Sequence, residues 1–327
     1  MPAGVTRARE KPCRTAWGAT GMMRRAAILL PPLLWLLLLV AAPVAILAGI
    51  ALSEAAPGVP PFIPPISPEG GWQGTFANLL TLVQDDTYAA AFLRSLVVAF
   101  VTAVLCLVLA YPMALGIAAA REGWRVPLLA LVLLPVWTGF LPRLGAWIGL
   151  LRDGGWVNGV LLALGLTEGP VPLLYTDAAL YLGMVHAYLP FVVLPLAATL
   201  LRRDLSVEEA AADLGASPWV VFRTVTLPLS LPGAVAAFLL VFIPAAGEFV
   251  IPELLGPPEA LLVGRALWAE FFQNRDWPLA AALAVALLAL LILPIRLFQR
   301  MEDDGGSRRG ASPPSRGSGR SPEGPKP

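Results

Sequence analysis

Apolar residues occur in six long runs, separated by shorter stretches that are rich in charged residues, glycine and proline. A helix of about 20 residues crosses the roughly 30 Å hydrocarbon layer of a bilayer, and every run reaches that length. The pattern therefore predicts six membrane-spanning helices and an all-α membrane protein. The predicted spans are 26–52, 92–120, 126–151, 178–201, 232–251 and 278–298. Because the first run is long and five more follow it, we expect a retained helix and not a cleaved signal peptide.

Two connecting features accompany these runs. Between spans 1 and 2 the segment APGVPPFIPPISPEGGW is too rich in proline for a helix or a central strand, which predicts an extended connection. The apolar spacing of the following TFANLLTLVQDDTYAAAFLRS predicts a short interfacial helix that leads into span 2.

Internal prolines predict kinks in spans 2 to 5, because each removes a helical hydrogen bond. They are Pro112, Pro135, Pro142, Pro190, Pro195 and Pro244.

Charge placement indicates the orientation of the chain in the membrane. Only 14% of the residues are charged and 57% are hydrophobic, which is unlike a soluble domain. Basic residues gather before span 1, between spans 2 and 3, between spans 4 and 5, and after span 6, so both termini are predicted to be cytoplasmic. The chain then divides into a basic arm (1–25), a membrane domain (26–300) and a polar tail (301–327) that is predicted to be disordered.

The sequence lacks the residues that common enzyme classes need. Its only lysines, Lys11 and Lys326, each precede proline, which excludes a P-loop for ATP. One histidine and two separated cysteines, Cys13 and Cys106, do not build a zinc site, a His-based nucleophile or a disulfide framework. We interpret His186 as a polar residue bonded between helices, with a substrate contact as the alternative. Six helices without catalytic residues indicate a transporter, with no cofactor or metal in this chain.

The segment EEAAADLGASPWVVFRTVTLPLSLPG is the least apolar piece in the middle of the chain. Ser206 is predicted to cap a short helix, with Glu208 and Glu209 well placed in its first turn. The alanines that follow form a small face which lets another backbone come close, and Gly215 is predicted to end the helix. A plain interfacial helix is the simpler alternative.

A second short helix is predicted directly after the glycine. Ser217 and Pro218 match the preferred cap and first helical position. The dipeptide Leu227-Pro228 is predicted to end this helix, and Pro232 is predicted to open span 5. Two short amphipathic helices joined at a bend, on the cytoplasmic side, favour a lever that another protein grips.

This segment resembles the EAA loop (206–233) of bacterial ABC importer permeases. The acid, the alanines and the glycine of that pattern correspond to Glu209, Ala210, Ala211 and Gly215. Other segments resemble the permeases of spermidine/putrescine importers, most closely the putrescine-importer permease, over roughly residues 26–300. They are LAYPMALGIA, LPVWTGFLPRLGAWIGLLRDGGWVN, HAYLPFVVLPL and FIPAAGEFVIPELLGPPEALLVGRALWAEFFQNRDWPLAAAL. The segment GPPEALLVG departs from the family by lacking a second glycine before its prolines.

The resemblance implies a type I ABC importer permease fold in the bacterial inner membrane and import of polyamines. It implies four partner subunits: a second homologous permease, two copies of an ATPase that bind ATP and Mg, and an extracytoplasmic substrate-binding protein. The coupling residues that it implies are Glu208, Glu209, Ala210, Ala211, Gly215, Ala216, Pro218, Leu227 and Pro228.

Glu248 is the residue that we expect on the substrate path. A carboxylate facing lipid costs about 2–4 kcal/mol, so it should face the bundle or a cavity, where it can bind a diamine ammonium. Candidate aromatic partners for the cation are Trp137, Tyr188 and Phe249, with packing as their alternative role. An alternative for Glu248 is an ion pair with Arg143 or Arg94. Glu253 and Asp276 are candidates for an outer gate.

Two rival functions remain open on the sequence alone. One is the same importer architecture for another solute, such as an amino-acid-derived cation, an organic acid or ferric iron. The other is an ATP-independent channel or carrier with an incidental amphipathic loop, against which the bent acid-alanine-glycine segment argues.

Overall fold

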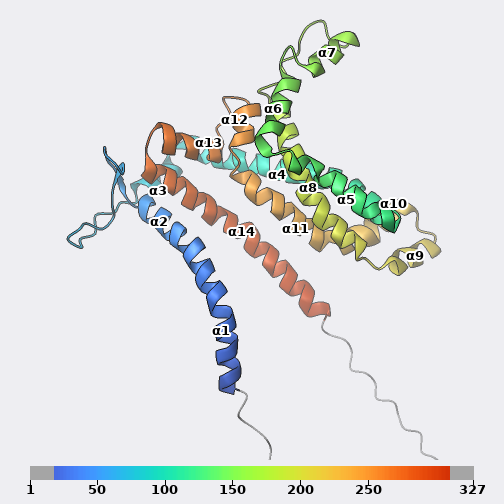
Figure 1. The fold of residues 1–327 in the computed structure, drawn as a ribbon, viewed down its shortest axis with the longest axis horizontal. Coiled ribbons are helices and arrows are strands. Elements are labelled where there is room, and N and C mark those ends of the chain that lie inside the picture. Colours follow the sequence, from blue (N-terminus) through green and yellow to red (C-terminus); the bar gives the residue numbers. More distant parts are fainter. Residues whose placement is uncertain (1–17, 310–327) are drawn as a thin grey trace, which may run out of the picture.

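The computed structural model describes residues 18–309 and is built mainly of helices (Figure 1). Five spans are long and apolar enough to cross a membrane, and one bent helix pair makes up to six, which agrees with the prediction. The five are Ala27–Ala51, α4 (Asp86–Ala119), α8 (Asp177–Leu201), Pro218–Ala246 and the Trp277–Arg296 part of α14 (Trp277–Arg309). Residues 1–17 of the predicted basic arm lie outside the described residues.

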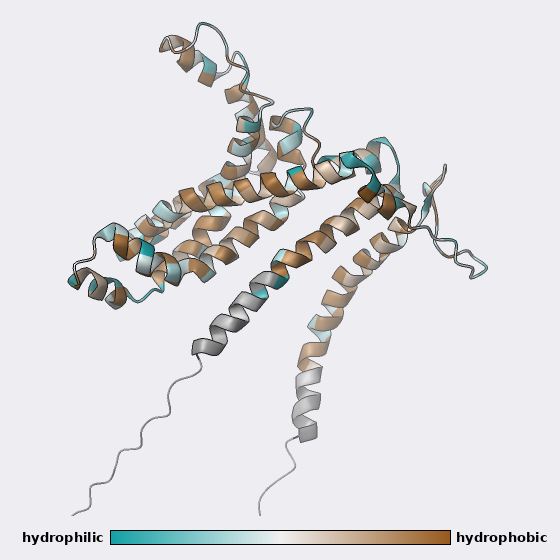
Figure 2. Cartoon of the chain, turned by 180° about the vertical axis from the view of Figure 1, so that it is seen from behind, coloured by the Kyte–Doolittle hydropathy of each residue, from teal (hydrophilic) through white to brown (hydrophobic). Residues whose placement is uncertain are grey.

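Span 1 consists of α1 (Gly18–Leu36), a π-helical turn η1 (Leu37–Ala41) and α2 (Ala42–Ala51). Only its C-terminal end is packed, because α2 contacts α14 and the short helix α3 (Ala77–Gln84) lies beside α14 as well. The side chains from Ile28 to Val40 are exposed and apolar (Figure 2). Such a surface is stable only against lipid or another membrane protein.

The connection after span 1 is extended, as the prolines predicted. It forms a small antiparallel pair of strands, β1 (Glu54–Ala55) and β2 (Phe62–Ile63), in which Glu54 pairs with Ile63. Helix α3 confirms the short helix expected before span 2. Asp85 then caps α4 by accepting a 2.8 Å hydrogen bond from the amide of Thr87.

The core of the molecule lies where α4, α8 and α11 (Leu227–Ala246) pack together. Small side chains fill this contact and let the helix backbones approach closely, which is how membrane helices gain packing energy. A Cβ atom on Gly233 of α11, for example, would overlap the Thr199 side chain of α8. The buried small residues include Ala103, Cys106, Ala110, Ala114, Ala197, Ala234 and Ala237.

Span 3 differs from the single helix predicted at 126–151. Helix α5 (Glu122–Trp137) ends before Gly139, and α6 (Phe140–Leu151) and α7 (Trp156–Ala163) continue at an angle of 83°. Gly139 has a φ of 78°, a left-handed value that glycine adopts without strain. Prolines at 135 and 142 flank the break, so the expected kinks are replaced by one sharp bend.

The fifth span is also different from the prediction at both ends. Helix α10 (Pro218–Val221), the π-helical turn η2 (Phe222–Thr226) and α11 run on as one span, so the predicted helix end at Leu227-Pro228 is wrong. The amide of Leu227 bonds the carbonyl of Phe222, five residues back. This wider turn accommodates Pro228, which lacks the donor of a regular helix. At its C-terminal end the span stops at Ala246 and not at residue 251.

Helix α14 extends farther than the predicted sixth span. It runs to Arg309, so residues 301–309 of the predicted disordered tail are helical. The remainder of that tail, residues 310–327, lies outside the described residues.

Candidate functional site

An elbow of two short helices projects at one end of the bundle, built from α9 (Leu205–Asp213) and α10 (Figure 1). Gly215 forms the bend with a φ of 88°. Its amide bonds the carbonyl of Ala212, and the amide of Ala216 bonds that of Ala211. These two bonds are those of a Schellman motif, which ends a helix on a left-handed glycine. The predicted stop at Gly215 is confirmed.

The start of α10 agrees with the prediction, whereas the start of α9 differs from it. Ser217 and Pro218 occupy the cap and first position of α10, as predicted. Ser206 is not the cap of α9, because Asp204 accepts a 3.0 Å hydrogen bond from the amide of Ser206. Hydrogen bonding from Ser206 favours the charged carboxylate and lowers the pKa of Asp204 below its ordinary value.

The elbow carries large apolar side chains that are exposed. Leu214, at the bend, is 90% exposed, and Leu205, Val207, Trp219 and Val220 are exposed beside it. Glu209, Ala210 and Pro218 are exposed too, whereas Ala211 and Ala216 are half-buried. A patch of large apolar side chains in a polar segment is typical of a protein or membrane contact.

Glu208 is half-buried, whereas Glu209 is exposed. The side chain of Glu208 is 18% exposed, and its carboxylate contacts Arg203 and Thr226 of the same chain. Of the two acids predicted for coupling, only Glu209 is therefore presented on the surface of the elbow. Leu227 and Pro228 do not cap a helix end but lie within the span that begins at the elbow.

Glu248 lies at a break in the membrane helices, between α11 and α12 (Val250–Leu255). Its carboxylate accepts a 2.8 Å hydrogen bond from the hydroxyl of Tyr188 on α8 and a 3.0 Å bond from the amide of Val250. The alternative ion pairs with Arg143 and Arg94 are not formed, and Arg94 bonds Asp177 at 3.1 Å. Glu248 therefore faces the bundle, as expected of a membrane carboxylate.

The break around Glu248 is fixed by close packing from α13 (Val263–Trp268). A Cβ atom on Gly264 would lie 2.6 Å and 2.8 Å from the carbonyl oxygens of Gly247 and Glu248. Real Cβ atoms do not approach oxygen this closely, so only glycine fits there. The amide of Val263 also donates a 2.8 Å hydrogen bond to the buried hydroxyl of Ser95 on α4. The backbone of the break is thus packed against α13, while the carboxylate of Glu248 bonds to α8 and to the start of α12.

The aromatic residues predicted around Glu248 are only partly assembled there. Tyr188 touches Glu248, but through its hydroxyl and not its ring face. Phe249 stacks on Trp268 with ring centroids 4.8 Å apart. Trp137, at the end of α5, is 87% exposed and has no aromatic contact among the described residues. Only Tyr188 is placed where a cation at Glu248 would meet it.

Glu253 and Asp276, the two candidates for an outer gate, each bond to partners within the chain. Glu253 forms a 2.7 Å ion pair with Arg265, which also donates to the carbonyls of Pro257, Pro258 and Ala260. Sequence reasoning missed this role of Arg265, although an arginine inside an apolar run is a visible signal. Asp276 accepts the amide of Leu279 and so caps α14.

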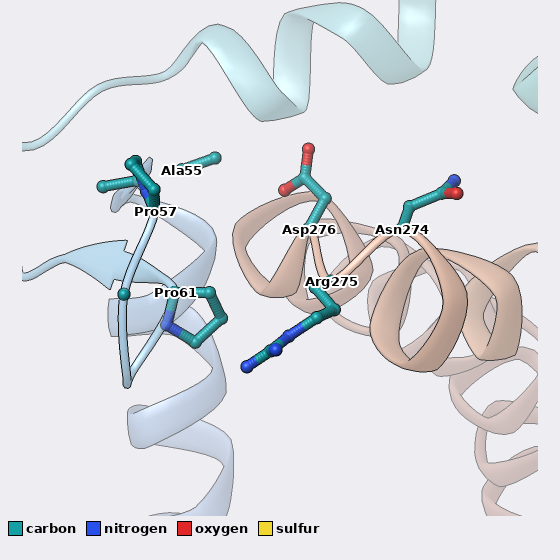
Figure 3. A pocket seen from close by; sticks show the side chains of 8 residues that line it. Ala55, Pro57, Pro61, Asn274, Arg275 and Asp276 are labelled. Carbon is teal, nitrogen blue, oxygen red and sulfur yellow. The ribbon is translucent and has the colours of Figure 1, made fainter.

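Asp276 also lines a pocket just before the start of α14. The pocket has a volume of about 480 Å³ and lies between the β1–β2 turn and residues 274–276. Figure 3 shows Arg275 extended toward Pro61 of that turn, whereas the carboxylate of Asp276 points away from it. The pocket is formed by the β1–β2 connection and the loop before α14, and Glu248 does not line it. Within the described residues, no group of three potential metal ligands converges.

Comparison with known proteins agrees with this architecture. Residues 115–304 match the family described as binding-protein-dependent transport system inner membrane component. The chain is 37% identical to the spermidine/putrescine transport system permease protein PotB of Salmonella typhimurium (strain SL1344) over 225 residues, covering 69% of this chain and 77% of PotB. Identity to PotB of Escherichia coli (strain K12) is 36% over 220 residues, covering 67% of this chain and 80% of PotB.

The fold has a counterpart among solved structures. One chain of a bacterial alginate ABC transporter, in complex with an alginate-bound periplasmic protein, superimposes with a TM-score of 0.65. The alignment covers 88% of this chain and 96% of that chain at 18% identity, which supports the fold alone. The match over more than half of the sequence shows the family: the chain belongs to the binding-protein-dependent transport system inner membrane components, and it is a membrane-spanning permease subunit of an ABC importer.

Proposed function

We propose that this permease imports polyamines, putrescine and spermidine, across the bacterial inner membrane. The observation that carries the proposal is the sequence identity of 36–37% between this chain and two PotB proteins, over about two thirds of the chain. The carboxylate of Glu248 supports it, because an acid held at a break in the membrane helices can receive an ammonium group. A polyamine offers two or more such groups.

We further propose the partners and the orientation. The chain pairs with a second homologous permease, an ATPase homodimer that binds ATP and Mg, and an extracytoplasmic substrate-binding protein. Both ends of the chain face the cytoplasm, as does the elbow. The permease contributes a path and the coupling to the ATPase, and it hydrolyses no ATP itself.

Coupling uses the exposed face of the elbow. Glu209 and Ala210 face solvent, and Leu214 and Trp219 provide exposed apolar area for a partner. Gly215 and Pro218 set the angle between the two helices, and Ala211 and Ala216 lie half-buried behind the contact. Because α10 continues into α11 without a stop, a displacement of the elbow is transmitted along α11 to the break that contains Glu248.

A transport assay tests the substrate. The transporter, purified with its partner subunits and placed in proteoliposomes with its binding protein, should take up labelled putrescine only when ATP is supplied. Unlabelled spermidine should compete, whereas molybdate, arginine and ferric citrate should not. Uptake that proceeds without ATP would instead support a channel or carrier. ATP-driven uptake of another solute with no effect of polyamines would support the alternative importer.

A further inference from the structure

A polar cluster fastens the inner side of the elbow to the membrane helices. Oε1 of Glu208 on α9 accepts a 2.7 Å hydrogen bond from the hydroxyl of Thr226, at the end of η2. The same oxygen lies 3.0 Å from Nε of Arg203, in the turn that follows α8. Arg203 and Glu208 are 15% and 18% exposed, and Thr226 is 4% exposed. One carboxylate thus joins α9 to the turn after α8 and to the end of η2.

The base to which Glu208 is fastened is itself well packed. The ring of Phe222 in η2 meets Tyr111 of α4 edge-on, with centroids 6.0 Å apart. The hydroxyl of Tyr111 lies 3.1 Å from that of Ser230, one turn beyond Thr226. Gly233 then packs directly on Thr199 of α8. Thr226 is therefore part of a rigid base formed by α4, α8 and α11.

The charges in this cluster make the contact specific. Arg203 has no other acidic partner among the described residues, and its Nε and Nη1 atoms are both buried without a hydrogen bond there, so its contact with Glu208 is an ion pair by distance and not a hydrogen bond. Half-buried ion pairs are weakly screened by solvent and salt, in contrast to exposed ones. Without Glu208, the guanidinium of Arg203 would lose its counter-charge, the buried hydroxyl of Thr226 would lose its acceptor, and α9 would lose its polar contacts to the base.

We propose that Glu208 is a positioning residue that clamps α9 to the end of α8 and to the start of α11, so that a displacement of the elbow moves both membrane helices together. This inference rests on the proposed coupling of the elbow to the ATPase. The clamp acts from the side of α9 that packs on the bundle, whereas Glu209 is exposed to solvent. Removing the clamp should uncouple ATP hydrolysis from solute import without detaching the ATPase.

Coupling efficiency in the assembled transporter tests the clamp. In proteoliposomes, Glu208→Ala should raise the ATP hydrolysed per putrescine imported by about fivefold or more, the lower range of coupling factors between distant sites. Thr226→Val should raise it less, because Arg203 still holds Glu208. Glu208→Gln, which keeps an acceptor for Thr226, should be intermediate. The double variant Glu208→Ala/Thr226→Val should be no worse than Glu208→Ala, because both act through one contact.

The matched control is Glu122→Ala, which removes an exposed acid from the first turn of α5. It should keep the wild-type ratio. A wild-type ratio in Glu208→Ala, additive effects in the double variant, or loss of the ATPase from purified Glu208→Ala would each overturn the clamp. If the Glu208→Ala permease does not fold and cannot be purified at all, Thr226→Val alone must raise the ratio.

Hydrogen exchange separates the clamp from the proposed substrate. In the purified complex, amides of residues 205–221 should exchange about fivefold faster or more in Glu208→Ala than in the wild type and in Glu122→Ala, because a fastened helix opens less often. Unchanged exchange contradicts the clamp, whatever solute is carried. Failure of the wild type to import putrescine while exchange responds as expected contradicts the proposed substrate alone.

Discussion

Substitution of the elbow glycine, Gly215→Val, should reduce putrescine uptake by about tenfold or more. A β-branched residue is strained at a φ of 88°, at a cost of about 1–3 kcal/mol. The strain is relieved by opening the Schellman turn, which changes the angle between α9 and α10. Since about 1.4 kcal/mol corresponds to a factor of ten in an equilibrium, a misplaced elbow should lose most of its productive contact with the ATPase.

The matched control for this variant is Gly215→Asn. Asparagine tolerates left-handed backbone better than other side chains, and a Cβ at this position meets open space. Gly215→Asn should therefore keep most of the uptake and the bound ATPase, whereas Gly215→Val loses both. Equal uptake in the two variants and the wild type would show that the bend has no part in coupling.

Glu248→Gln should lower the kcat/KM of putrescine uptake by about tenfold while the complex stays assembled. The amide side chain keeps an oxygen for Val250 or Tyr188 but carries no charge for an ammonium group. Hydrogen bonds to charged groups contribute about 1.5–3 kcal/mol, so loss of the charge accounts for a factor of this size. The measurement is initial uptake rate against putrescine concentration, with ATPase retention checked by copurification.

Tyr188→Phe separates the role of the Glu248 carboxylate from that of its hydrogen bond to α8. The variant removes the hydroxyl that bonds Glu248 and leaves the carboxylate itself in place. If the charge receives the substrate, uptake should fall much less in Tyr188→Phe than in Glu248→Gln. Equal losses in both variants would mean that the hydrogen bond between α8 and the break matters, and Glu248 would no longer belong to the path.

The long elements could be predicted from the sequence because they depend on local pattern. Six apolar runs of membrane-spanning length give the spans, and Gly215 and Pro218 mark the elbow by their backbone preferences. The cap of α9 was misplaced because Asp204 and Ser206 are both good caps two residues apart. Only the folded geometry shows that Asp204 accepts the bond.

The contacts that build the sites are long-range, and the pattern does not encode them. Tyr188 and Glu248 are 60 residues apart, and their side-chain directions depend on how α8 and α11 pack. The π-helical turn before Pro228 has no signal in composition, so the proline was interpreted as a helix end. The inward direction of Glu208 was likewise hidden, because neighbouring acids in a first turn look equivalent in sequence.

Cross-linking from the tip of the elbow tests the central claim most directly. In a chain whose Cys13 and Cys106 are replaced by alanine, Leu214→Cys places a thiol on a side chain that is 90% exposed. Val59→Cys, on the equally exposed turn between β1 and β2, is the control on the outer side. With a short bifunctional thiol reagent in the assembled transporter, position 214 should cross-link to the ATPase and position 59 should not. A wild-type-like complex in which position 214 forms no ATPase adduct, and reacts only within its own chain or with reagents confined to lipid, would contradict the account.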